Sequence, residues 1–224
     1  MSNCHTVEVM AIVEGKTEQI FVEQILQTYL ADKQIYINAT QVSKPGQKGG
    51  DVHFDKVKRD LGNHLKQRTD TYITTIIDYY GIKAWPGLDH IPPQATPEQI
   101  AQTINAATKK EVEKLFSAQQ ADKRFIPYIS VHEFEALLFS DSNILATELG
   151  INQADIDAVI TKYGEPEAIN NNPQTAPSKR LDHWSNGKFL KTVTGITIAQ
   201  KITIPQIREK CRLFDAWLRA FEEL

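Results

Sequence analysis

One short apolar segment, Val7–Val13, constrains the fold more than any other part of the chain. Its seven residues, VEVMAIV, include a single polar side chain, Glu8. A run this short that is apolar on both alternating faces is typical of a strand buried between two layers of helices, as in parallel α/β sheets. Glu14 therefore follows the carboxyl end of a strand, and ligands bind at that edge in open α/β sheets.

Three more strands are predicted, and helical segments separate them. The strands are expected at Ile35–Ala39, Thr71–Ile77 and Phe125–Val131. Pro127 places the last of them at a sheet edge or near the beginning of the strand. Apolar residues at three- and four-residue spacing between the strands predict helices. This alternation specifies an α/β fold with a four-stranded parallel sheet, flanked by helices and joined by right-handed crossovers.

The part of the chain after about residue 140 shows no strand pattern and is predicted to be helical. A last helix is expected over Pro205–Glu222, because apolar residues recur on one of its faces. They are Ile207, Cys211, Phe214, Leu218 and Phe221. The predicted organisation is an α/β domain over residues 1–140 and a helical C-terminal extension over residues 141–224 that packs on it as a cap.

Composition limits the class of protein. The 224 residues carry a formal net charge of −3, so contact with nucleic acid must come from a local basic patch. No apolar run approaches the roughly 18 residues that predict a membrane span, and the amino terminus lacks a secretory pattern. A cytoplasmic protein without a membrane partner is therefore expected. Cys4 and Cys211 fit reduced thiols there.

Five carboxylates are predicted to meet at the carboxyl edge of the sheet. Glu14, Asp78 and the pair Glu133 and Glu135 follow three different strands, and Glu18 lies one helical turn beyond Glu14. Carboxylates in one crevice repel each other unless a cation neutralises them, and a set of oxygen ligands suits Mg²⁺ or Mn²⁺. Such an ion could polarise a phosphodiester and activate a water molecule.

Three of these acids also have an ordinary structural interpretation. The helix dipole favours Glu14 and Glu18 near a helix start, and Asp78 could simply be a turn residue. The coincidence of acids at three strand ends is what indicates a functional site.

Two basic groups are candidates for contact with nucleic acid. Lys44 and Lys48 lie in the glycine-rich loop Ser43–Asp51, and either of them or Lys83 could hold a phosphate. The second group is interleaved with Trp184 and Phe189, as suits charge attraction and base stacking. It comprises Lys179, Arg180, Lys188, Lys191 and Lys201. The alternative in both cases is an ordinary solvated surface.

Several of these segments together resemble one protein family. They are EGKTE at 14–18, IDYYG at 77–81, HEFEALLFSD at 132–141, PSKRL at 177–181 and GITIAQKI at 195–202. Their pattern is similar to the DUF4276 family of TOPRIM-like proteins over almost the whole chain. TOPRIM domains, as in topoisomerases, bacterial primases and overcoming-lysogenization-defect nucleases, have a four-stranded parallel sheet and bind Mg²⁺ at the strand ends.

The resemblance assigns roles to three of the acids. Glu14 corresponds to the TOPRIM glutamate, Glu18 to the second acid of the overcoming-lysogenization-defect motif, and Asp78 to the first acid of an Asp-x-Asp pair. Tyr80 stands at the second position of that pair. The resemblance therefore implies either that Glu133 or Glu135 completes the ligand set, or that metal binding is weakened.

The function implied by the resemblance is a Mg²⁺-dependent nuclease acting on DNA or RNA. The alternative is a non-catalytic module that binds nucleic acid or a partner protein. Family likeness also implies an ATPase partner of the AAA or SMC-like type, with this chain as the effector of a defence against phage. Assembly into a homo-oligomer is left open.

Overall fold

The computed structural model describes residues 6–43, 52–131, 133–169 and 174–224. The chain divides into two compact units. The first unit combines Met1–Ile129 with Trp217–Leu224, and the second unit is Ser130–Ala216. The division thus falls after Ile129 instead of at residue 140, and it returns the last helical residues to the α/β unit.

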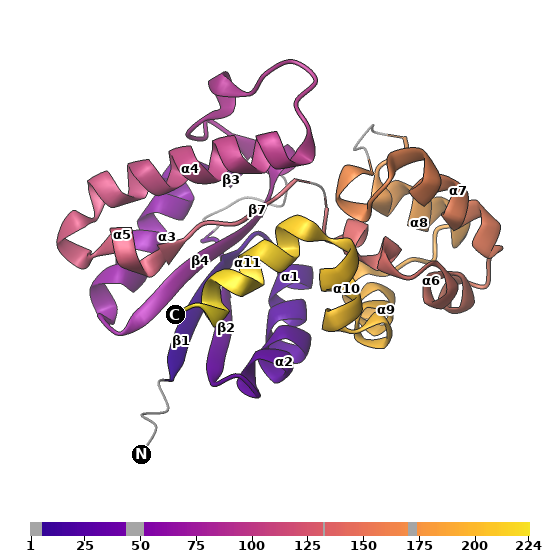
Figure 1. Ribbon diagram of the computed structural model, residues 1–224, viewed down its shortest axis with the longest axis horizontal. Coiled ribbons are helices and arrows are strands. Elements are labelled where there is room, and N and C mark those ends of the chain that lie inside the picture. Colours follow the sequence, from indigo (N-terminus) through magenta and orange to yellow (C-terminus); the bar gives the residue numbers. More distant parts are fainter. Residues whose placement is uncertain (1–5, 44–51, 132, 170–173) are drawn as a thin grey trace. The chain divides into compact units, whose positions relative to one another are not determined.

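The first unit contains a parallel sheet whose strand order is β2-β1-β4-β6 (Figure 1). The strands are β1 (Val7–Val13), β2 (Ile35–Gln41), β4 (Thr71–Asp78) and β6 (Phe125–Ile126). Strand β1 pairs in parallel with β2 and β4, and β4 pairs in parallel with β6. The predicted α/β fold with a four-stranded parallel sheet is confirmed.

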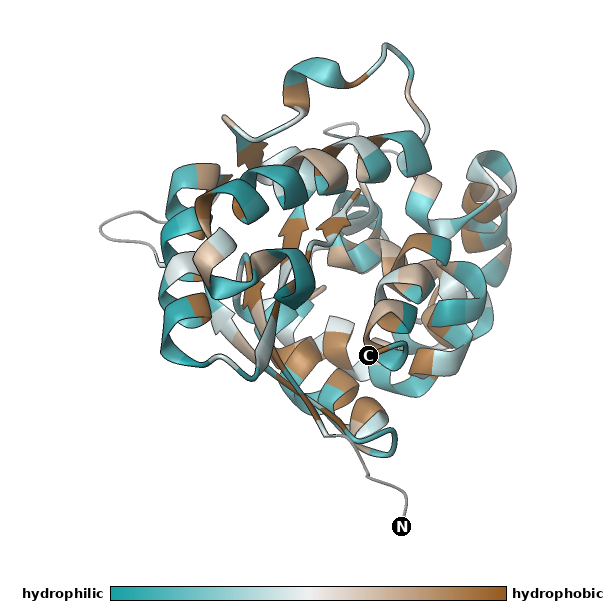
Figure 2. Cartoon of the chain, turned by 60° about the vertical axis from the view of Figure 1, so that its left-hand side comes forward, coloured by the Kyte–Doolittle hydropathy of each residue, from teal (hydrophilic) through white to brown (hydrophobic). Residues whose placement is uncertain are grey.

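Helices cover both faces of this sheet. A helix formed by α1 (Lys16–Phe21), a π-helical turn (Val22–Leu26) and α2 (Gln27–Ala31) connects β1 to β2. Helices α3 (Phe54–Gln67) and α4 (Pro97–Leu115) make the next two crossovers, which run back across the sheet. Right-handed crossovers in opposite directions place these two groups of helices on opposite faces. The strands between them are largely apolar, whereas the outward turns of the helices are polar (Figure 2).

The predicted fourth strand is present but interrupted at Pro127. Strand β6 ends at Ile126, and β7 (Ile129–Ser130) begins two residues after Pro127. The hydroxyl of Thr75 donates to the carbonyl of Tyr128 and accepts from its backbone N–H, both at 3.2 Å. Proline is tolerated here because β6 lies at the edge of the sheet, as predicted.

The second unit is built from short helices. They are a buried 3-10 segment (Phe134–Ser140), α6 (Ser142–Leu149), α7 (Gln153–Tyr163), α8 (Pro177–Trp184), α9 (Ile196–Ile202), α10 (Ile204–Lys210) and the start of α11 (Arg212–Glu222). Further short elements of the chain are β3 (Val52–His53), β5 (Ile82–Lys83) and α5 (Ala121–Arg124).

The single helix predicted over Pro205–Glu222 is wrong, because the chain forms α10 and α11 with a break at Cys211. Cys211 has an extended backbone, with φ −119° and ψ 93°. The carboxylate of Glu167 accepts hydrogen bonds from the N–H groups of Leu213 and Phe214, at 2.8 and 2.9 Å. Helix α11 therefore has its own capped start, which a buried acid from a distant segment provides.

Candidate functional site

Glu14 and Asp78 lie side by side at the carboxyl edge of the sheet. The backbone N–H of Glu14 donates to the carbonyl of Ile76 at 3.1 Å, so Glu14 continues the pairing between β1 and β4. Asp78 is the last residue of β4, and its N–H donates to Oε2 of Glu14 at 3.3 Å. Both residues are half-buried. The first unit thus brings together two of the predicted carboxylates at adjacent strand ends.

Two glycines allow the backbone to approach these acids closely. A Cβ atom on Gly81 would lie 3.0 Å from both carboxylate oxygens of Glu14. A Cβ atom on Gly15 would lie 3.1 Å from Oε2 of Glu18, which is in the first turn of α1. A side chain at either position would press on a carboxylate. The glycines thus set the space in which Glu14 and Glu18 sit.

Tyr80, which stands where the resemblance expects a second acid, is a neutral phenol at physiological pH. It lies in the 3-10 turn Tyr79–Gly81, and its ring packs edge-on against that of Tyr79, with centroids 5.0 Å apart. Burial, with a smaller contribution from Tyr79, raises the pKa of Tyr80 to about 12. Tyr80 can donate a hydrogen bond there but supplies no negative charge.

Glu133 belongs to the second unit, where it caps a helix. Its Oε2 accepts from the N–H of Ser178 at 2.9 Å, and its Oε1 accepts from the Ser178 hydroxyl at 2.8 Å. Ser178 lies in the first turn of α8, whose N–H groups have no partner within the helix. A negative charge there also suits the helix dipole. Glu133 therefore stabilises the start of α8.

Glu135 also belongs to the second unit and is 1% exposed. Its Oε1 lies 2.9 Å from Nζ of Lys191, although this oxygen makes no hydrogen bond among the described residues. Burial raises the pKa of Glu135, and the ammonium of Lys191 partly offsets that shift. Glu135 is therefore a buried acid balanced by one ion pair. The prediction that Glu133 or Glu135 completes the ligand set of Glu14 and Asp78 stays a prediction.

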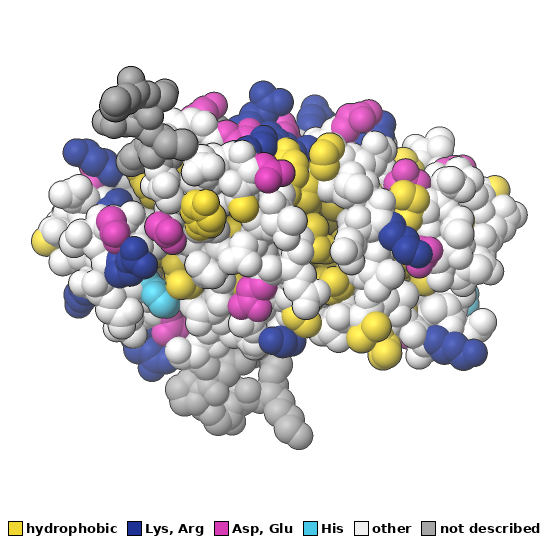
Figure 3. All heavy atoms as spheres, turned by 90° about the horizontal axis from the view of Figure 1, so that it is seen from below, with side chains coloured by type: hydrophobic (Ala, Val, Ile, Leu, Met, Phe, Trp, Pro, Cys, Tyr) yellow, Lys and Arg dark blue, Asp and Glu magenta, His cyan; other side chains and the backbone are white. Residues whose placement is uncertain are grey.

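The predicted basic residues have different surroundings. Lys44 and Lys48 lie outside the described residues, and Lys83 is in β5. Lys179 is exposed on α8, whereas Nε of Arg180 donates to the carbonyl of Thr175 at 2.7 Å. On the face shown in Figure 3, Lys and Arg side chains are interspersed with acidic ones.

His53, which no sequence motif marks, lies opposite Lys83 in a short strand pair. Strand β3 pairs in parallel with β5, and His53 and Lys83 are partners in this ladder. Each strand has only two residues, so neither shows a hydrophobic period that the sequence could reveal.

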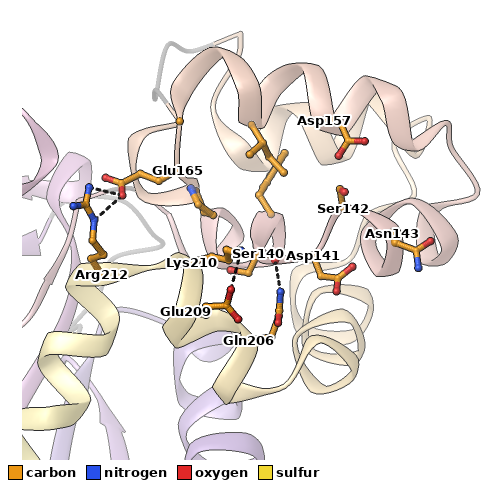
Figure 4. Close-up of a pocket in the computed structure, with 14 residues that line it drawn as sticks. Ser140, Asp141, Ser142, Asn143, Asp157, Glu165, Gln206, Glu209, Lys210 and Arg212 are labelled. Atoms are coloured by element: carbon orange, nitrogen blue, oxygen red, sulfur yellow. Dashed lines mark hydrogen bonds and ion pairs between the residues drawn. The ribbon is translucent and has the colours of Figure 1, made fainter.

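The second unit contains a cavity of about 560 Å³ (Figure 4). One wall is Phe139–Asp141, the end of the HEFEALLFSD segment. Four charged groups in the wall form two ion pairs: Arg212 with Glu165 at 2.9 Å, and Lys210 with Glu209 at 3.0 Å. The volume suits a small molecule. The cavity has no sequence signature, because its walls come from widely separated segments.

The acids of the first unit fit a hard divalent ion by their chemistry. Glu14, Glu18 and Asp78 offer only oxygen atoms, and Mg²⁺ is commonly held by one or two carboxylates with water completing its shell. Within the described residues, no group of three or more His, Cys, Asp or Glu side chains is placed to hold a metal ion. Glu14 and Asp78 would be the first ligands of an ion at this edge, and Glu18 and water could complete its shell.

The architecture is that of an α/β protein with two carboxylates, Glu14 and Asp78, at adjacent strand ends of its parallel sheet. A family model described as "Domain of unknown function (DUF4276)" matches residues 13–222. The protein belongs to this family, as the sequence pattern predicted. A search of curated proteins and a search of solved structures gave no match. In the described part of the chain, no helix is long and apolar enough to cross a bilayer.

Proposed function

We propose that the protein is a nuclease that hydrolyses phosphodiester bonds in DNA or RNA with Mg²⁺ or Mn²⁺. The observation that carries this proposal is the pairing of Glu14 with Asp78 at adjacent strand ends, where the N–H of Asp78 donates to Oε2 of Glu14. A kinship with TOPRIM domains, and with overcoming-lysogenization-defect nucleases in particular, is part of the proposal.

The acidic residues of the site would have different roles in the reaction. Glu14 and Asp78 would hold the ion, and Glu18 would either ligate it or act as the general base. When bound, a divalent ion would polarise the phosphodiester and lower the pKa of a water molecule. The N–H of Asp78 orients the carboxylate of Glu14. Tyr80, whose pKa is about 12, would remain protonated and donate a hydrogen bond to substrate.

The same proposal gives the chain a partner. An AAA or SMC-like ATPase would control the nuclease, and the pair would act against phage with this chain as the effector. Co-purification of this protein with such an ATPase, and cleavage that depends on ATP in the complex, would support this part. Equal cleavage with and without the ATPase would count against it.

Plasmid DNA, single-stranded DNA and tRNA should each be incubated with the protein in Mg²⁺, Mn²⁺ or EDTA. We expect metal-dependent cleavage of at least one substrate, and a loss of about 100-fold or more in Glu14→Gln, because the ion then lacks a charged ligand. Glu8→Gln is the matched control, since Glu8 lies near the other end of β1. Cleavage in EDTA, or undiminished cleavage by Glu14→Gln, would refute the proposal.

Tyr80 favours a second candidate function, a non-catalytic module that binds nucleic acid or the partner ATPase. A neutral phenol in place of an acid leaves fewer charges for the ion. Calorimetric titration with Mg²⁺ and Mn²⁺ separates the two functions. Absence of metal binding together with intact binding of nucleic acid or partner would favour the module.

A further inference from the structure

The small sheet β3–β5 places two basic side chains on one side of a ladder. His53 in β3 is the parallel partner of Lys83 in β5, and neighbouring strands are about 4.8 Å apart. Val52 and Ile82 are 1% and 7% exposed, whereas Lys83 is exposed and His53 is half-buried. Because successive side chains of a strand point to opposite sides, His53 and Lys83 share the outward side.

This ladder lies next to the carboxylates of the candidate site. Strand β5 begins directly after the turn Tyr79–Gly81. The backbone of Gly81 is close to the Glu14 carboxylate, because a Cβ atom added to Gly81 would lie 3.0 Å from both carboxylate oxygens of Glu14. Lys83 is two residues further along, so its Cα is within about 7 Å of that of Gly81. The flexible four-carbon stem of lysine can therefore carry its ammonium group to the edge where Glu14 lies.

The amino end of α3 adds to the positive potential at this ladder. His53 immediately precedes α3 as its N-cap residue, and its own side chain forms no capping hydrogen bond. The first N–H groups of a helix lack partners within it, and this end carries a partial positive charge. The acid in that turn, Asp55, forms an ion pair with Lys58 at 2.6 Å, and this contact lowers the pKa of Asp55. The negative charge of Asp55 is thus balanced mainly by Lys58, with a smaller charge interaction with His53.

We propose that His53 and Lys83 form a phosphate-binding pair that holds the nucleic-acid backbone beside the Glu14–Asp78 edge. The inference rests on the proposed function for its substrate and names two positioning residues for it. Lys83 provides a point charge, and the imidazole of His53 provides an N–H donor in either of its neutral forms. Such contacts read the backbone and not the base sequence.

The experiment is fluorescence anisotropy with labelled single-stranded DNA, duplex DNA and single-stranded RNA in EDTA, where metal-dependent cleavage is absent. Affinity should be measured over a series of salt concentrations for wild type and Lys83→Gln. We expect the slope of log affinity against log salt to fall by about one for Lys83→Gln, because one phosphate contact is lost. Lys114→Gln is the matched control, since Lys114 is 76% exposed on α4, and its slope should equal that of wild type.

His53 is tested by two substitutions. His53→Ala should weaken binding about fivefold through the loss of one hydrogen bond. His53→Asn keeps a donor and suits the position before a helix, so it should restore most of the affinity. Equal weakening in both variants, with thermal melts equal to wild type, would overturn the role of His53.

The outcomes distinguish this inference from the nuclease proposal. An unchanged salt slope in Lys83→Gln, or no binding of any probe by wild type, overturns the phosphate-binding pair even if Glu14-dependent cleavage is found. A reduced slope without cleavage under any metal condition supports the pair and counts against the nuclease. Comparing the three probes shows which backbone the pair prefers.

Discussion

Carboxylates in the two units are held in different ways. In the first unit, Glu14 accepts the backbone N–H of Asp78 at a long 3.3 Å, across two adjacent strand ends. In the second unit, Glu133 and Glu167 each accept two shorter hydrogen bonds at the start of a helix. A carboxylate that satisfies the first turn of a helix is needed by the fold. An acid at a strand end can take part in ligand binding without leaving helix N–H groups unpaired.

The largest expected effect separates these two kinds of acid by metal affinity. Asp78→Asn should weaken Mn²⁺ binding by about 100-fold. Substitution of a residue that only hydrogen-bonds to a metal ligand already lowers metal affinity about 10- to 100-fold, and Asp78 is proposed as a ligand itself. Glu133→Gln should leave the affinity within about threefold, since its oxygens are engaged by Ser178. Isothermal titration calorimetry measures both. Similar losses in the two variants would make Glu133 a ligand and remove the distinction.

The next effect concerns stability in the second unit. Glu167→Ala should lower the free energy of unfolding by about 2–3 kcal/mol, because two N–H groups at the start of α11 lose a charged acceptor. Its neighbour Glu165 is the control, because it pairs with Arg212, which is 71% exposed. Glu165→Ala should cost less than about 1 kcal/mol. Equal losses in urea unfolding would contradict the capping role of Glu167.

The smallest effect is the pH dependence that Glu135 confers. Its pKa is raised by burial, so the stability it contributes is fully present below its ordinary pKa and is lost as the pH rises through the raised value. Glu135→Gln cannot ionise. This variant should therefore gain stability relative to wild type, by about 1 kcal/mol, as the pH rises above the ordinary pKa of 4.5.

Thermal or urea melts at several pH values measure this difference. The control is Glu148→Gln, because Glu148 forms an ion pair with Lys201 at 2.5 Å and is 21% exposed. Glu148→Gln reports the effect of the same substitution at an ion pair that is less buried. A pH-independent difference for Glu135→Gln would show that burial of Glu135 carries no penalty.

The sequence predicted the elements whose information is local. Strands β1, β2 and β4 have runs of alternating or continuous apolar residues, and their order along the chain with helices between them implies the parallel sheet. That alternation also places Glu14 and Asp78 at the same edge of the sheet, whereas their adjacency depends on the pairing of β1 with β4, which the order along the chain does not specify. The interruption at Pro127 also reflects a local property, the missing N–H of proline.

Features that depend on distant residues could not be predicted in this way. The apolar face of Pro205–Glu222 continues across Cys211, so periodicity alone indicates one helix, whereas Glu167 caps a second one. The hydrogen bonds of Glu133 depend on Ser178, far along the chain. The partnership of His53 with Lys83 comes from a ladder too short to leave a pattern.

The return of Trp217–Leu224 to the first unit has a consequence for biosynthesis. The indole N–H of Trp217 donates to the hydroxyl of Thr74 in β4 at 2.9 Å, and its ring stacks on Tyr128 with centroids 4.7 Å apart. A ribosome must therefore translate all of Ser130–Ala216 before the α/β unit can acquire this part of its core. Until Trp217 emerges, the side chains of Thr74 and Tyr128 that it contacts lack this partner. A chaperone would therefore find the most exposed apolar surface on the nascent sheet during this interval.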